Sequence, residues 1–204
     1  VATTTNDEDG ILADYVQELG YSVFKGSEND VLLRYYEAFA SLDESDDVDA
    51  IVRITGDCPL FDPLICDRLV EKYLNANLDF ANLAGNYAEG LDCAIFSKEL
   101  LIEANTEAKL VSEREHVTQY FNKNRVRFKI DSLINEVDDS KYRITVDEAE
   151  DFVVVEKIIT ALTSNKLSFA FENIKNYLNS NPEVWAINSS IIRNEGLLKS
   201  LNQD

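Results

Sequence analysis

Residues 50–63 read AIVRITGDCPLFDP. The apolar residues 50–54 predict a strand that is buried on both faces, as strands of parallel sheets are. A Gly-Asp pair predicts a turn directly after that strand. Pro63 suits the first turn of a helix, which we expect to run to about Leu74. The stretch therefore predicts a strand, a short loop and a helix in succession.

The rest of the chain repeats this alternation. Further strands are expected at 1–4, 21–24, 79–83, 92–96, 126–130 and 142–146. A helix capped by Asn6 is expected at 6–19, and a second helix is expected to follow a cap at Asp30. Further helices are expected at 98–104, 110–122, 148–162 and 169–178. Such alternation predicts an α/β fold, a sheet with helices on both faces. Ligands bind such sheets at the carboxyl ends of the strands, so residues directly after strands are the first candidates for function.

Length and charge limit the class of protein. The chain has 204 residues, which predicts one domain over 1–204. Its 38 acidic and 19 basic residues give a net charge of −19, which repels nucleic acid and anionic membrane surfaces. Three cysteines, an odd number, predict free thiols and a cytoplasmic protein. There is no Met, and the chain starts within an expected strand, so we expect a piece of a longer protein.

Two aspartates follow two of the expected strands. Asp57 follows the strand at 50–54, and Asp147 follows the strand at 142–146. We expect both carboxylates to converge on one cleft and to hold Mg²⁺ that neutralises the phosphates of a nucleoside triphosphate. The alternative is that Asp57 and Asp147 each occupy a turn and cap the helix that follows.

Two other segments carry candidate residues. Arg114 and His116 lie in SEREHV, where an arginine can pair with the carboxylate of an anionic sugar. The alternative for the single histidine is a structural role. Gly26 and Ser27 offer exposed backbone to a nucleotide base, or simply form a turn before a capped helix. Cys58 with His116 as a nucleophile pair is a further alternative, whereas the cysteines lack the spacing of a zinc site.

Seven stretches together resemble the bacterial cytidylyltransferases of the spore-coat polysaccharide type, which are related to CMP-acylneuraminate and CMP-Kdo synthetases. These stretches are VATTTN at 1–6, FKGSENDVLLRY at 24–35, RITGDCPLFDP at 53–63, GLDCAIFS at 90–97, SEREHVTQYF at 112–121, YRITVDEAEDF at 142–152 and AINSSIIRNEGLLKSL at 186–201. They cover nearly the whole chain in family order.

The resemblance implies a fold and a reaction. The fold would be the three-layer α/β sandwich of the nucleotide-diphospho-sugar transferases (GT-A-like), with a mixed, mostly parallel sheet. The reaction would join CTP and a sugar acid into a CMP-sugar and pyrophosphate, with Mg²⁺ as cofactor, for surface polysaccharide synthesis. A middle lobe at about 80–130 would reach into a partner subunit, which makes a homodimer.

The resemblance also implies roles for particular residues. Asp57 and Asp147 match the two aspartates that bind Mg²⁺ in the family. Contacts to the sugar are implied for Asp92, Arg114 and His116. The nucleoside pocket is implied to include Gly26, Ser27 and Arg34.

The chain departs from the family pattern at two places. The family opens with a strand and a basic loop of the form A-R-x-G-S-x-R-L-P-G-K, which is absent from the printed sequence. The family's Gly-Leu-Asp-x-Glu run ends here in Ala94. Two alternatives to an active cytidylyltransferase therefore stay open: an inactive, truncated relative that serves as a binding subunit, and a glycosyltransferase of the same fold.

Overall fold

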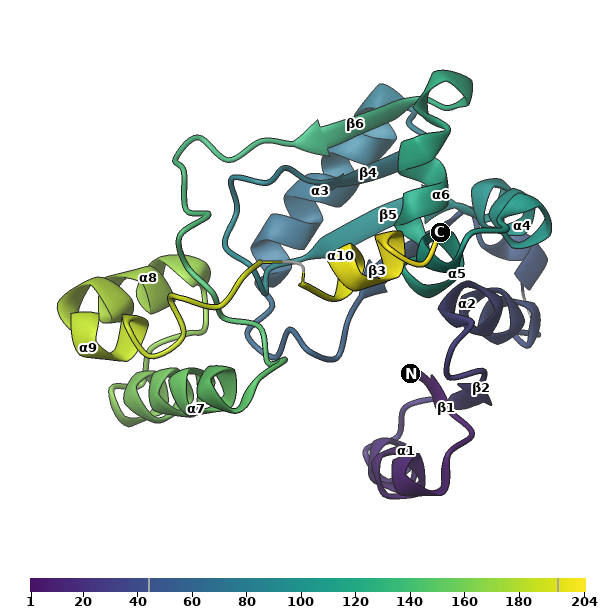
Figure 1. Ribbon diagram of the computed structural model, residues 1–204. Coiled ribbons are helices and arrows are strands. Elements are labelled where there is room, and N and C mark those ends of the chain that lie inside the picture. Colours follow the sequence, from purple (N-terminus) through teal and green to yellow (C-terminus); the bar gives the residue numbers. More distant parts are fainter. Residues whose placement is uncertain (44, 194) are drawn as a thin grey trace. The chain divides into compact units, whose positions relative to one another are not determined.

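The computed structural model describes residues 1–43, 45–193 and 195–204 and shows a mixed α/β fold (Figure 1). Residues 44 and 194 are outside the described residues, and residue 194 belongs to the last of the resembling stretches. The chain divides into two compact units. The first comprises Val1–Ile51, Phe96–Phe128 and Asn194–Asp204, and the second comprises Val52–Ile95 and Lys129–Arg193. Among the described helices, none has the length and apolar character needed to cross a membrane.

The first unit contains a short parallel sheet. Strand β1 (Ala2–Thr4) pairs with β2 (Phe24–Gly26), with Ala2 opposite Phe24. The helical elements of this unit are a 3₁₀ turn (Asp7–Asp9), α1 (Gly10–Glu18), α2 (Val31–Ala40), a 3₁₀ turn (Ser45–Asp47), α4 (Lys98–Glu107), α5 (Val111–Glu115), α6 (Thr118–Lys123), a 3₁₀ turn (Arg125–Arg127) and α10 (Glu195–Leu201).

The start of the chain differs in detail from the prediction. The expected helix at 6–19 begins as a 3₁₀ turn, and the Asn6 side chain makes no capping hydrogen bond. Asp9 instead accepts hydrogen bonds from Thr3 Oγ1 (2.9 Å) and from the backbone amide of Thr4 (3.0 Å). These bonds tie α1 to the end of β1. The second strand lies at Phe24–Gly26 and not at 21–24, whereas the cap at Asp30 is confirmed by a 2.9 Å bond from the Leu33 amide.

Helices α2, α4, α5 and α6 enclose the apolar interior of the first unit. The Phe96 and Phe121 rings lie 5.1 Å apart there, and both side chains are fully buried. The prediction of one helix over 110–122 was wrong, because the chain breaks between α5 and α6. Val117, at the break, is buried and has a φ of 45°, which a β-branched residue rarely adopts. Tertiary packing therefore overrides the local helical pattern at this point.

The second unit holds most of the larger sheet. Strands β3 (Ala50–Ile54), β5 (Cys93–Ser97), β4 (Phe80–Leu83) and β6 (Ile130–Leu133) form a four-stranded sheet in that order. Strands β4 and β6 are parallel, and α3 (Pro63–Ala76) packs against them. The prediction that β3 is buried on both faces was wrong, since Val52 is 40% exposed and Ile54 45% exposed. The described strand lies at the edge of its sheet, where one side has no neighbour to cover it.

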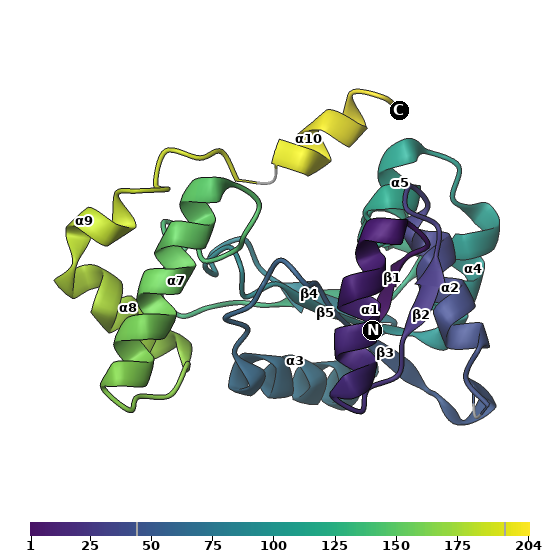
Figure 2. The same ribbon diagram turned by 90° about the horizontal axis from the view of Figure 1, so that it is seen from below.

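Helices α7 (Ala149–Ser164), α8 (Phe171–Ser180) and α9 (Pro182–Trp185) gather against one another in the second unit (Figure 2). Their apolar faces join the buried core residues Leu60, Leu91, Tyr142 and Ile144. The strand expected at 142–146 is reduced to an isolated parallel bridge between Glu89 and Arg143. Residues 142–147 therefore run as an extended segment against α7, and Asp147 stands where α7 begins.

Candidate functional site

The structure brings the two predicted aspartate stretches into direct backbone contact. The Val146 amide donates a 2.8 Å hydrogen bond to the Asp57 carbonyl oxygen. The Thr145 hydroxyl donates a second bond, of 3.0 Å, to the same oxygen. The turn after β3 is thereby attached to the segment that carries Asp147, and both belong to the second unit.

A third segment, at 89–92, completes this junction. The Glu89 amide donates to the Tyr142 carbonyl at 3.0 Å, and the Ile144 amide donates to the Glu89 carbonyl at 2.8 Å. Gly90 follows with a φ of 102°, and a Cβ atom there would lie 2.5 Å from backbone atoms of Ile144 and Thr145. Only glycine allows the two segments to approach so closely.

The side chains of Asp57 and Asp147 are exposed on this junction. Neither caps a helix, so the capping interpretation of both was wrong. Helix α3 is capped by Asp62, whose carboxylate accepts from the Leu64 amide at 2.9 Å, and Glu148 occupies the N-cap position of α7. Both carboxylates are thus available from the solvent side.

Arg143 lies beneath Asp147 and contacts three carboxylates. Its Nη2 donates to Asp147 Oδ2 and to Asp151 Oδ2, each at 2.8 Å. Its Nε donates to Asp151 Oδ1 at 2.8 Å, and its Nη1 donates to Glu89 Oε2 at 2.7 Å. The Arg143 side chain is only 7% exposed. The pKa of its guanidinium, which burial by itself would lower, is raised by these carboxylates.

Asp151 anchors this cluster from the first turn of α7. It is fully buried, and its carboxylate also accepts bonds from Asn188 Nδ2 (2.8 Å) and from the amides of Asp147 (3.1 Å) and Glu148 (3.0 Å). Burial alone would raise the pKa of Asp151, but the hydrogen bonds from Arg143, Asn188 and the two amides hold it below its usual value. Asp151 is therefore an ionised anchor of the segment that carries Asp147.

Asp92 and Cys58 flank the junction. The Asp92 side chain is exposed, and its Oδ2 accepts a 3.1 Å bond from the Gly90 amide. Cys58 is buried beside Thr55 Oγ1 and Asp57 Oδ1, each 3.4 Å from its Sγ. Burial raises the pKa of the Cys58 thiol to about 12. A thiol that stays protonated at neutral pH is a poor nucleophile, which argues against the cysteine interpretation.

The three residues predicted for the nucleoside pocket lie together in the first unit. Arg34 Nη1 donates a 2.6 Å bond to the Ser27 carbonyl oxygen. A Cβ atom on Gly26 would lie 3.0 Å from Arg34 Cγ and 2.8 Å from the Phe24 ring. Gly26, Ser27 and Arg34 therefore form one small structure at the carboxyl end of β2.

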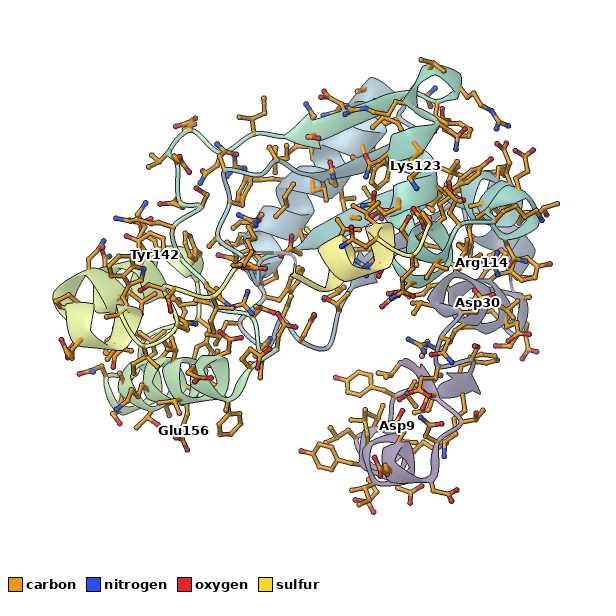
Figure 3. The ribbon with its side chains drawn as sticks, in the orientation of Figure 1. Asp9, Asp30, Arg114, Lys123, Tyr142 and Glu156 are labelled. Carbon is orange, nitrogen blue, oxygen red and sulfur yellow. The ribbon has the colours of Figure 1, made fainter. Side chains whose placement is uncertain are left out.

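Arg114 is engaged in an ion pair of the first unit. Its Nε donates to both Asp30 oxygens at 2.9 Å, and its Nη2 donates to Asp30 Oδ2 at 2.6 Å (Figure 3). Its Nη1 also donates to the Asn105 carbonyl oxygen at 2.9 Å. Arg114 thus links α5 to the start of α2 and to α4, and contact with a substrate would require this arrangement to open.

His116 lies beside α10 in the same unit. Its Nε2 is 2.9 Å from the Ser200 hydroxyl oxygen, which is 2.5 Å from Glu115 Oε2. This is a local polar contact between α5 and α10. It gives His116 a structural partner without excluding a contact to a ligand.

Comparison with known proteins identifies the family of the chain. A family model described as cytidylyltransferase matches residues 1–187. The chain belongs to the cytidylyltransferase family. It is 36% identical to an uncharacterized protein of Methanocaldococcus jannaschii over 94% of this chain and 76% of that protein. It is 26% identical to the spore coat polysaccharide biosynthesis protein SpsF of Bacillus subtilis, over 90% of this chain and 75% of that one.

A solved cytidylyltransferase from Leptospira borgpetersenii has the same fold. The TM-score is 0.78 at 33% sequence identity, over 89% of this chain and 75% of that one. The resemblance predicted from the seven stretches, and with it the fold of the nucleotide-diphospho-sugar transferases, is therefore confirmed. As a cytidylyltransferase the chain is an enzyme of the CTP-using nucleotidyltransferase class.

The donor set of this cytidylyltransferase suits a hard cation. The part of the chain that the structure describes holds no group of three or more His, Cys, Asp or Glu side chains able to bind a metal ion by themselves. Mg²⁺ bound with a nucleotide takes one or two protein carboxylates and fills its other positions with phosphate oxygens and water. Asp57 and Asp147 fit that requirement, because both are exposed and the Asp57 carbonyl is bonded to Val146, the neighbour of Asp147.

The side chains beneath Asp147 were not predicted from the sequence. Glu89, Asp151 and Asn188 surround Arg143, and none of the three was a candidate. One signal was present, because an arginine within the apolar run YRITV must bury its charge or leave the sheet. That signal indicates a buried partner, but it does not say which of 38 acidic residues supplies it.

Proposed function

We propose that this cytidylyltransferase transfers the cytidylyl group of CTP to a sugar acid and releases pyrophosphate, and that it serves surface polysaccharide synthesis. The contact between Asp57 and the Asp147 segment is the observation that carries the proposal. It attaches the turn after β3, which carries Asp57, to the segment that carries Asp147. The family model and the similarity to a spore coat polysaccharide protein support the choice of nucleotide and pathway.

The chemistry requires one displacement at phosphorus. A sugar oxygen attacks the α-phosphorus of CTP, the bond from this phosphorus to the α,β-bridging oxygen breaks, and pyrophosphate leaves with that electron pair. The proton of the sugar hydroxyl passes to solvent. Asp57 and Asp147 are the residues proposed to hold Mg²⁺, which would neutralise the phosphate charge and orient the leaving group.

The remaining candidates divide between nucleoside and sugar. We assign Gly26, Ser27 and Arg34 to the nucleoside, because Arg34 fixes the Ser27 backbone and packs beside Gly26. The sugar acid is assigned to Asp92, Arg114 and His116. Arg114 would have to exchange Asp30 for the sugar carboxylate, and this exchange would cost the energy of a partly buried ion pair.

Assembly and location complete the proposal. A homodimer formed through the segment at about 80–130 and a cytoplasmic location are both predictions from sequence. Light scattering on the purified full-length protein tests the first, and a mass consistent with one chain would contradict it. Three free cysteines agree with the second.

Pyrophosphate release is the decisive measurement. The full-length protein, with any coding sequence that precedes Val1, is incubated with CTP, Mg²⁺ and a panel of nonulosonic and other sugar acids. We expect pyrophosphate with CTP and one class of acid, and much less with ATP, GTP or UTP. Pyrophosphate from no combination would support the inactive relative. Release of a nucleoside mono- or diphosphate from a ready-made nucleotide-sugar would support the glycosyltransferase.

A further inference from the structure

We infer that Arg143 is a positioning residue of the cation site, and that Asp151 and Asn188 act through it. This inference rests on the proposed function, because it assigns Asp147 to a cation. Its basis is the geometry of the buried cluster beneath that carboxylate.

The Arg143 guanidinium is held in one orientation. Asp151 binds it in a bidentate manner, with 2.8 Å bonds to Nε and Nη2, and Glu89 binds Nη1 at 2.7 Å. Asn188, itself buried, donates from its single amide nitrogen to Asp151 Oδ1 at 2.8 Å and to the Arg143 carbonyl oxygen at 3.1 Å. A guanidinium fixed by two buried carboxylates has little freedom to follow the side chain of Asp147.

The same guanidinium holds Asp147 by one oxygen. Nη2 donates to Asp147 Oδ2 at 2.8 Å, and the side chain is 49% exposed. Asp147 Oδ1 accepts no hydrogen bond from the described residues. The arrangement orients the carboxylate with one oxygen and leaves the other open, so that a cation and Arg143 can bind the same group together.

The charges of the cluster also favour a cation beside Asp147. One guanidinium faces the three carboxylates of Glu89, Asp147 and Asp151. The positive charge within the cluster is therefore smaller than the negative charge, and Asp147 is the member that reaches solvent. A divalent cation at that end would reduce the imbalance without entering the buried part.

A purely structural role is the competing explanation. Arg143 also attaches residues 142–148 to α7, so its loss would destabilise the fold in either case. The two explanations differ in the affinity for a cation. A structural role changes stability alone, whereas a positioning role changes cation affinity in protein that is still folded.

The test compares variants of the full-length protein by Mn²⁺ binding. Free Mn²⁺ is measured by electron paramagnetic resonance in the presence of CTP, together with the Mg²⁺ dependence of pyrophosphate release and the thermal unfolding of the unliganded protein. Arg143→Lys keeps the charge but loses the fork that binds Asp151 and Asp147 together. We expect about 10- to 100-fold weaker Mn²⁺ binding and a matching rise in the Mg²⁺ concentration for half-activity, with a smaller change in kcat.

Two further variants keep the test decisive. Asn188→Ala removes only the bonds to Asp151 and to the Arg143 carbonyl, so we expect a smaller loss of Mn²⁺ affinity than in Arg143→Lys. This variant carries the test if Arg143→Lys does not fold. Arg127→Lys alters an arginine that also bridges two carboxylates, Glu103 and Glu107, in the first unit, and should leave Mn²⁺ affinity unchanged.

The outcomes separate this inference from the proposed function. Folded Arg143→Lys and Asn188→Ala proteins with wild-type Mn²⁺ affinity would overturn the inference while the activity stands. A wild-type protein that neither binds Mn²⁺ with CTP nor releases pyrophosphate would overturn the proposed function, and the positioning role with it.

Discussion

The amide of Val146 and the carbonyl oxygen of Asp57 form a 2.8 Å hydrogen bond, which joins two places far apart in the sequence. Each residue stands at or beside an aspartate that follows an apolar run. The bond fixes the backbone of one aspartate relative to that of the other. Neither carboxylate caps a helix, and both side chains are exposed, so both can be reached by a ligand.

Replacing either aspartate by asparagine should reduce activity far more than stability. Asp57→Asn and Asp147→Asn each remove a charge from the proposed cation site, and we expect pyrophosphate release to fall by about 100-fold or more. Both side chains are exposed, so the unfolding free energy of Asp57→Asn should change by only about 0.5 kcal/mol. Asp67→Asn, at an exposed position of α3, is the matched control. Full activity in both site variants would remove Asp57 and Asp147 from the mechanism.

Glycine at position 90 should be indispensable for stability. An added methyl group would meet the Ile144 and Thr145 backbones at 2.5 Å, and the φ of 102° is itself unfavourable for other residues. We expect Gly90→Ala to cost about 2–5 kcal/mol in urea unfolding. Gly85→Ala, in the same loop, meets no atom within 4 Å and should cost about 0.5 kcal/mol or less. Equal losses of unfolding free energy in the two variants would contradict the close approach of Gly90 to the Ile144 and Thr145 backbones.

The parts of the fold that could be predicted are those with a local signal. The cap at Asp30 and the helix after Pro63 follow from side-chain and backbone preferences within a few residues, and both are confirmed. The break at Val117 has no such signal, because apolar periodicity continues through it. The expected strand at 142–146 shares its hydrogen bonds between Glu89 and Asp57, and pairing of this kind depends on distant segments.

The candidate site likewise has a part with a local sequence signal and a part that depends on distant segments. Aspartates after apolar runs are visible in the sequence, so Asp57 and Asp147 could be proposed as site residues from it. The buried cluster around Arg143 depends on which carboxylates the fold brings near it. Asp151 is close to Arg143 in the sequence, but Glu89 comes from a distant segment. The sequence predicts a sugar contact for Arg114 because an arginine can pair with a carboxylate, but it does not show that the fold brings Asp30 to this arginine.

Cys58 should be unreactive in the native protein. Burial holds its pKa at about 12, so almost no thiolate exists at pH 8. We expect iodoacetamide to label Cys58 at pH 8 only after unfolding, as followed by peptide mass spectrometry. Cys58→Ala should retain activity within a few-fold of the wild type, since the thiol contributes no nucleophile. Rapid labelling of the folded protein, or loss of activity without loss of stability, would revive the cysteine interpretation.

The contact between Asp204 and Lys123 should be visible in a titration. Hydrogen bonds from Lys123 Nζ (2.8 Å) and from Ser112 hold the pKa of the Asp204 carboxyl at about 2, against an ordinary 3.8. Since the folded value is depressed, the contact contributes fully above about pH 4 and is lost as the pH falls toward 2. Lys123→Ala should raise this pKa toward 3.8, as measured by carbon NMR of the side-chain carboxyl. Lys157→Ala, on α7, should leave it unchanged, and a value still near 2 in Lys123→Ala would contradict the assignment.

Arg114 and Asp30 should show strong energetic coupling. Three hydrogen bonds of 2.6–2.9 Å join them, with side chains only 19% and 30% exposed. We expect Arg114→Ala to cost about 2–3 kcal/mol and a double-mutant cycle with Asp30→Asn to give a coupling of about 1–3 kcal/mol in urea unfolding. The more exposed pair Arg127 and Glu103 is the control, with an expected coupling of about 0.2–1 kcal/mol.

Kinetics on an Arg114→Lys variant decide whether this arginine also contacts the substrate. A structural arginine should leave the KM for the sugar acid nearly unchanged in Arg114→Lys, provided the protein is folded at the assay temperature. A substrate contact should raise that KM by about tenfold or more, because lysine cannot pair with a carboxylate through two parallel bonds. Strong coupling to Asp30 together with an unchanged KM would assign Arg114 to the fold alone, and the sugar carboxylate would then need another partner.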